Sequence, residues 1–171
     1  MSKTAKLALF VAAAVLSAVW SAPAQAQCNA PTTVTLFAGR TMNAGTVSVS
    51  NDTVNLYVQY STTSPWVLTA AHLAVADSLA GIPHTHAGNP IPGRFPYSAT
   101  FDPEVTSFTF TIPLSNYSPG QTLYIAAHAV VLTPSSGSGG GTQTGWADGS
   151  GFPGANWATY FQYTVASCGP E

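Results

Sequence analysis

The four histidines of the chain are the residues best suited to chemistry. His72 and His128 each lie inside an apolar run and follow two alanines, in WVLTAAHLAVA and TLYIAAHAVVL, whereas His84 and His86 form a His-x-His pair in IPHTHAGNPIPGRFPY. Imidazole nitrogens are common ligands of zinc and copper. If the two apolar runs are adjacent strands and the segment between them folds over, all four histidines form one metal site.

A plainer interpretation of the histidines stays open. His72 and His128 would then be neutral core or edge residues bonded to backbone carbonyls, and His84 and His86 would be solvated loop residues. Met42 is the only methionine that follows the predicted signal peptide, which excludes a methionine-rich copper(I) site. The sequence therefore requires no cofactor, and zinc or copper is the cofactor that a histidine cluster would hold.

A second group of residues suits the binding of a ligand. Aromatic rings at loops and strand ends stack on sugars or anchor protein partners. For each ring, the alternative is that it covers an end of the core, and for an arginine that it holds a loop in place. The candidate ligand-binding residues are Arg94, Phe95, Tyr97, Trp146, Asp148, Phe152 and Trp157.

Nucleophilic catalysis finds little support in the sequence. There is no G-x-S-x-G segment that would present a serine, and the mature chain has no lysine for a Schiff base. The two cysteines are more simply explained as a disulfide than as thiol nucleophiles. We therefore assign no catalytic residue and favour a protein that is not an enzyme.

The first 26 residues predict export. The basic start MSKTAK, the apolar run LALFVAAAVLSAVW and the small residues of SAPAQA are typical of a signal peptide that is cut after Ala26. The mature chain, residues 27–171, has two arginines against six acidic residues, a formal charge of −4. So few cations argue against nucleic acid as a partner, and no later apolar stretch suits membrane insertion. We expect a secreted or periplasmic protein.

The two cysteines lie near opposite ends of the mature chain. Cys28 and Cys168 predict one disulfide, because paired cysteines are the simplest outcome in an exported protein. The bond would close almost the whole chain into one loop. It would also hold the first and last strands close together.

The hydrophobic pattern predicts an all-β fold. Apolar residues alternate with period two or form short continuous runs, and turn residues separate the runs. We predict one domain, residues 27–171, folded as an antiparallel two-sheet β-sandwich of about seven strands. Two long loops, 77–105 and 133–156, interrupt it; the Gly/Ser-rich first half of the second is expected to be mobile, and 70–76 has a short helix as its alternative. The strand candidates are 32–38, 46–50, 54–60, 66–76, 106–112, 122–132 and 157–165.

Several segments resemble a family of small secreted bacterial β-sandwich proteins of no known activity. The resemblance rests on GTVSVSNDTVNLYVQYSTTSPWVLTAAHLAV, GNPIPGRFPY, YIAAHAVV and GWADGSGFPGANWATYFQYTV, and it covers most of residues 37–165. It implies an exported single β domain. It implies no activity.

These observations lead to a functional prediction. We expect an exported non-catalytic binding module that recognises a glycan or an extracellular surface protein through its aromatic end loops. One alternative is a structural subunit of an extracellular matrix or filament, whose self-association would distinguish it. The other is a metal-binding protein built on the histidines.

Overall fold

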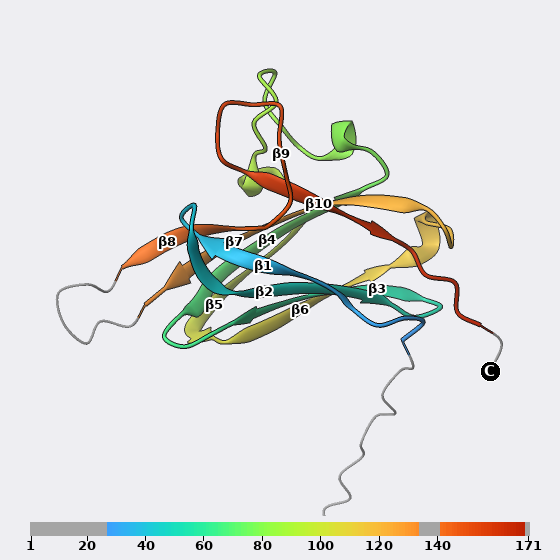
Figure 1. Cartoon of the computed structure of the whole chain (residues 1–171), viewed down its shortest axis with the longest axis horizontal. Helices are drawn as coiled ribbons and strands as arrows, with labels where there is room; N and C mark the ends of the chain where they lie inside the picture. Colours follow the sequence, from blue (N-terminus) through green and yellow to red (C-terminus); the bar gives the residue numbers. More distant parts are fainter. Residues whose placement is uncertain (1–26, 134–140, 170–171) are drawn as a thin grey trace, which may run out of the picture.

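The computed structural model describes residues 27–133 and 141–169 (Figure 1). The predicted signal peptide, most of the Gly/Ser-rich stretch and the last two residues lie outside the described residues. Within the described residues no helix is long and apolar enough to cross a membrane. The strands are β1 (Thr32–Ala38), β2 (Met42–Asn51), β3 (Asn55–Thr62), β4 (Val67–Ala76), β5 (Tyr97–Val105), β6 (Ser107–Pro113), β7 (Thr122–Leu132), β8 (Thr142–Ala147), β9 (Ser150–Gly151) and β10 (Thr159–Thr164), and the short 3-10 helices are η1 (Leu79–Gly81), η2 (Pro92–Arg94) and η3 (Leu114–Asn116).

All ten strands belong to one antiparallel hydrogen-bonded network. The main path runs β5-β4-β7-β8-β1-β2-β3-β6, and β10 pairs with both β7 and β9. The path curls into two layers, in which β2, β3 and β6 lie across from β4, β7 and β10 (Figure 1). The Tyr60 hydroxyl of β3 joins the layers by donating a hydrogen bond to the His72 carbonyl of β4, 3.0 Å away. The all-β, two-layer prediction is confirmed, although the described residues contain ten strands rather than about seven.

The two predicted long loops contain the additional strands. β5 occupies the end of 77–105, and β8 and β9 lie within 133–156. In β5 the side chains of Tyr97, Ala99 and Phe101 turn toward the core and alternate with exposed neighbours, which is the period of a half-buried strand. The strand was not predicted because Asp102, Pro103 and Glu104, which follow these residues, are of types depleted in strands. The alanine-rich segment 70–76 is part of strand β4 and not a helix.

The main core fills the space between the two layers. Leu56, Val58 and Tyr60 of β3 point into it as the alternation predicts, whereas Val54 lies in the preceding turn and is 58% exposed. The main core also draws on the inward faces of β1, β2, β4, β6, β7 and β10. Burial of these apolar faces is the principal stabilising term of such a fold.

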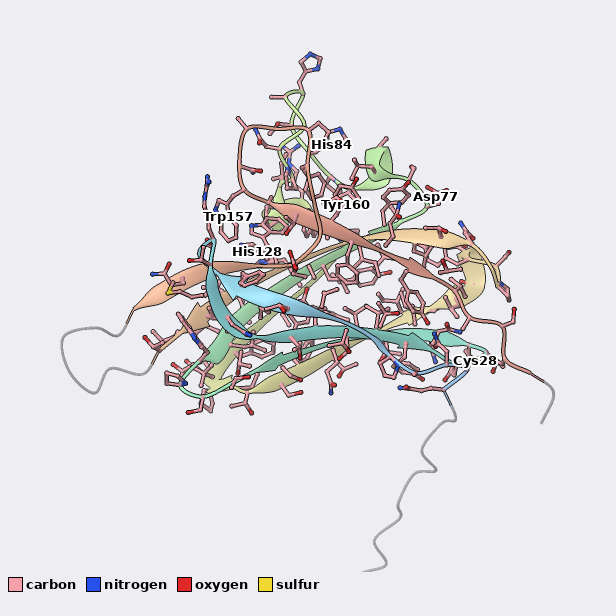
Figure 2. The ribbon with its side chains drawn as sticks, viewed as in Figure 1. Cys28, Asp77, His84, His128, Trp157 and Tyr160 are labelled. Carbon is pink, nitrogen blue, oxygen red and sulfur yellow. A yellow bond between two sulfur atoms is a disulfide. The ribbon has the colours of Figure 1, made fainter. Side chains whose placement is uncertain are left out.

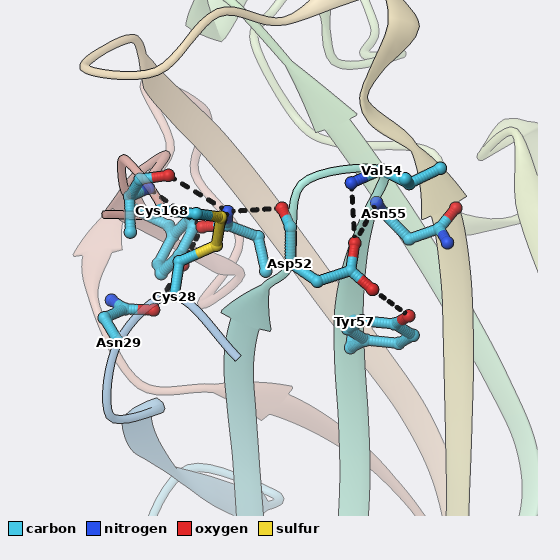
Figure 3. The surroundings of a disulfide bond; sticks show 10 residues. Cys28, Asn29, Asp52, Val54, Asn55, Tyr57 and Cys168 are labelled. Atoms are coloured by element: carbon cyan, nitrogen blue, oxygen red, sulfur yellow. Dashed lines mark hydrogen bonds between the residues drawn. A yellow bond between two sulfur atoms is a disulfide. The ribbon is translucent and has the colours of Figure 1, made fainter. Parts of the chain in front are cut away.

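A polar cluster closes the end of the domain where the termini meet (Figure 3). Cys28 and Cys168 form the predicted disulfide. The buried side chain of Asn51 lies beside it: its amide donates to the carbonyl of Ala166 at 3.1 Å, and its oxygen accepts from the hydroxyl of Tyr163 at 2.6 Å. The last strand, the first residues and the β2–β3 turn are therefore held together by one set of hydrogen bonds.

Candidate functional site

His72 and His128 are direct cross-strand partners. The antiparallel register of β4 and β7 places the two residues opposite each other, with their Nδ1 atoms 3.3 Å apart and their ring centroids 5.3 Å apart. Their sequence neighbours Leu73 and Ala127 belong to the main core. Because successive side chains of a strand point to opposite faces, both imidazoles lie on the outward face of the sheet.

Two loops cover the same outward face. We call residues 77–96 and 148–158 the cap; in Figure 1 they lie together above β4, β7 and β10. Ala74 and Ala126 pair beside the histidines, and their small side chains let the cap approach the sheet closely. Between the cap and the sheet lies a hydrophobic cluster separate from the main core, which we call the second core. Its buried residues are Ala74, Ile82, Phe95, Ala126, Trp146, Phe152 and Ala158.

The two histidines differ in exposure. His128 is only 7% exposed, and the ring of Trp146 meets it edge-on with centroids 4.9 Å apart. His72 is half-buried and has Ser98 of β5 opposite it on its other side. A row of side chains thus crosses four strands in the order Ser98, His72, His128 and Trp146, and solvent reaches the pair from the side of His72.

Both imidazoles are neutral at neutral pH. Burial, reinforced by the neighbouring His72, lowers the pKa of His128 from 6.5 to about 4. Burial also lowers the pKa of His72. A neutral imidazole carries one N–H and one free lone pair, which is the form that binds a metal ion.

The loop histidines do not join this pair. His84 is exposed, and its Nδ1 atom lies 2.6 Å from the carbonyl oxygen of Ile82, where it lines a hollow of about 310 Å³ together with Phe152. His86 is also exposed. Figure 2 shows His84 in the loop above the sheet and His128 at the level of the strands. Residues 27–133 and 141–169 contain no group of three or more His, Cys, Asp or Glu side chains that could hold a metal ion.

Most of the predicted ligand-binding rings are occupied in packing. Phe95, Trp146 and Phe152 are each no more than 7% exposed, and both phenylalanine rings pack edge-on against Trp146. Tyr97 points the other way, toward the main core, where its ring contacts Phe110. A sugar or a partner protein reaches these rings only if the cap opens.

The three remaining candidates lie at the surface of the cap or beside it. Arg94 ends η2 and is exposed, and Asp148 is exposed with its carboxylate accepting the N–H of Gly149 at 2.9 Å. Trp157 packs against the second core and stays partly exposed. The structure therefore brings together four rings of the predicted set in the second core and turns the fifth, Tyr97, to the main core. It leaves the two charged members of the set on the outside.

Sequence reasoning missed Ser98, which flanks His72. The residue falls in a segment that was predicted to be a loop, and the alternation of YSATF was the signal that could have placed it on a strand beside His72.

Comparison of the chain with family models, with curated proteins and with solved structures finds no match. The functional assignment rests on the geometry of the site.

Proposed function

We propose that this protein binds a zinc ion between the imidazoles of His72 and His128. The observation that carries the proposal is the distance of 3.3 Å between the two Nδ1 atoms. Zn–N bonds of about 2.0–2.1 Å at a tetrahedral angle place two ligand nitrogens about 3.3 Å apart. Neighbouring ligands of a square-planar copper(II) ion are closer, at about 2.8 Å, so the spacing favours zinc.

The surroundings of the pair also suit a metal ion. Neither imidazole has to lose a proton at neutral pH, because burial holds the pKa of each below its usual value. The metal requires the tautomer with the proton on Nε2, which leaves both Nδ1 lone pairs free. The rigid β4–β7 ladder fixes the two rings, so little ordering is needed when the ion binds.

Water completes the coordination in this proposal. Two protein ligands leave two positions of a tetrahedral ion open, and the half-buried side of His72 admits water to them. Such a site binds zinc less tightly than a structural site with four protein ligands. The proposal concerns binding alone and assigns no reaction.

Titration of the mature protein with zinc tests the proposal. We expect one zinc ion per chain at pH 7.5 by isothermal titration calorimetry and native mass spectrometry, and at least a tenfold weaker affinity in His72→Ala. The His86→Ala variant is the matched control, because it removes an exposed histidine outside the pair. Equal loss in His86→Ala, or unchanged binding in His72→Ala, would contradict the assignment.

A further inference from the structure

The outward face of β1, β2, β3 and β6 carries no charged side chain along its paired rows. One row across these strands runs Thr33, Ser48, Gln59 and Thr109, and the next runs Thr35, Thr46, Ser61 and Ser107. The partners on this face are hydroxyl and amide groups, which both donate and accept hydrogen bonds. The face lies on the opposite side of the domain from the cap (Figure 1).

A groove of about 160 Å³ lies in this face where β2 ends and β3 begins. A typical site for a drug-sized molecule encloses about 300–1,000 Å³, so this groove suits a single small ring. Hydroxyl and amide side chains make up most of its wall. It is lined by Gln27, Pro31, Ser48, Ser50, Tyr57, Gln59 and Thr109.

One wall residue has an unused hydrogen-bonding group. Ser50 is 4% exposed and lines the groove, yet its hydroxyl makes no hydrogen bond within the described part of the chain. No buried side-chain polar atom of the described residues lacks a partner, so this hydroxyl is reached by solvent in the groove. A ligand in the groove would replace water as its hydrogen-bond partner.

The aromatic wall of the groove is held in a fixed orientation. The hydroxyl of Tyr57 donates to the carboxylate of Asp52 at 2.7 Å (Figure 3). Burial acts to raise the pKa of Asp52, but this bond and the bonds from the backbone N–H groups of Asn55 and Val54 outweigh it and hold the pKa below its usual value. Asp52 is therefore an ionised acceptor at neutral pH, and it fixes the edge of the tyrosine ring.

We propose that this groove binds one sugar residue of a neutral glycan. A pyranose ring presents hydroxyl groups around its edge and C–H groups on its faces, which match the serine, threonine and glutamine side chains and the Tyr57 ring. No lysine or arginine side chain lines the groove, so its wall lacks the side chains that bind a carboxylate or phosphate in bidentate fashion. The site is independent of the histidine pair.

Titration with neutral oligosaccharides tests this inference. The probes are cellohexaose and maltohexaose, with an oligogalacturonate as the acidic comparison, and binding is followed by chemical-shift changes in the mature protein. We expect one neutral probe to bind and shift the groove residues. Ser50→Ala should weaken it about fivefold through the lost hydrogen bond, and Tyr57→Ala about tenfold.

Variants with little risk to the fold keep the test decisive. Gln59→Ala removes an exposed wall amide and should weaken binding several-fold, whereas the exposed cap variant His86→Ala should bind as the wild type does. Circular dichroism confirms that each variant is folded. Failure of both neutral probes or preference for the acidic one would overturn the inference. So would wild-type affinity in both Ser50→Ala and Gln59→Ala, or concentration-dependent pairing of two copies through this face.

Discussion

Acidification from pH 7 to pH 4.5 is expected to lower the free energy of unfolding of the metal-free protein by about 2 kcal/mol through His128 alone. In the folded state burial lowers the pKa of this histidine from 6.5 to about 4. The unfolded chain therefore binds the proton first, at a pH near 6.5, and stability falls as the pH drops from there toward 4. Well above pH 6.5 both states are neutral at this residue and the contribution is constant.

Denaturant unfolding in the presence of a chelator measures this dependence. The free energy of unfolding at pH 7 and at pH 4.5 is compared between the wild type and His128→Leu, which removes the titrating group without adding charge. The difference between the two pH values should be smaller in the variant. Asp52, whose folded-state pKa is also lowered, loses its contribution only below this range, near and under its usual 3.8. The same pH dependence in His128→Leu would contradict the burial of a neutral imidazole.

Loss of the disulfide is expected to have an effect of similar or larger size. The bond closes a loop with a sequence separation of 140 residues. In the chain-entropy model, removing the disulfide that closes a loop of that length lowers the free energy of unfolding by about 4–5 kcal/mol. Cys168→Ser should therefore shift the denaturant midpoint strongly downward while the secondary structure in the absence of denaturant stays unchanged.

Reduction gives the matched control for this prediction. Dithiothreitol should lower the midpoint of the wild type, but it should have no effect on a variant in which Cys28 and Cys168 are both serine. The hydrogen bonds of Asn51 to Ala166 and Tyr163 persist in either case, so the end of the domain stays in contact. Equal midpoints for the oxidised and reduced wild type would show that the bond does not constrain the unfolded chain.

The histidine pair shows which features of the site can be predicted from the sequence. Two AAH runs, each apolar and of strand length, predicted that His72 and His128 lie on strands, and the metal hypothesis required those strands to be adjacent. The adjacency is confirmed, whereas the register that opposes the two rings depends on the irregularity between Leu68 and Ala70. No local pattern reveals such a register, because it is set by pairing with distant strands.

The loops show where sequence reasoning fails. Phe95 and Phe152 lie among prolines and glycines, where no period indicates which side a ring faces, and their burial follows from two loops packing together on paired alanines. The wall of the polar groove was missed for a related reason. The alternation of β3 indicates that Tyr57 and Gln59 face outward. No sequence pattern indicates that Gln27 and Pro31, which precede β1, lie beside them.

The most direct test of the zinc site is anomalous diffraction at the zinc absorption edge from crystals of the mature protein grown with zinc. We expect an anomalous peak about 2.0–2.1 Å from the Nδ1 atoms of both His72 and His128, with water in the remaining positions. A zinc ion bound by His84 or His86 instead, with none between His72 and His128, would contradict it.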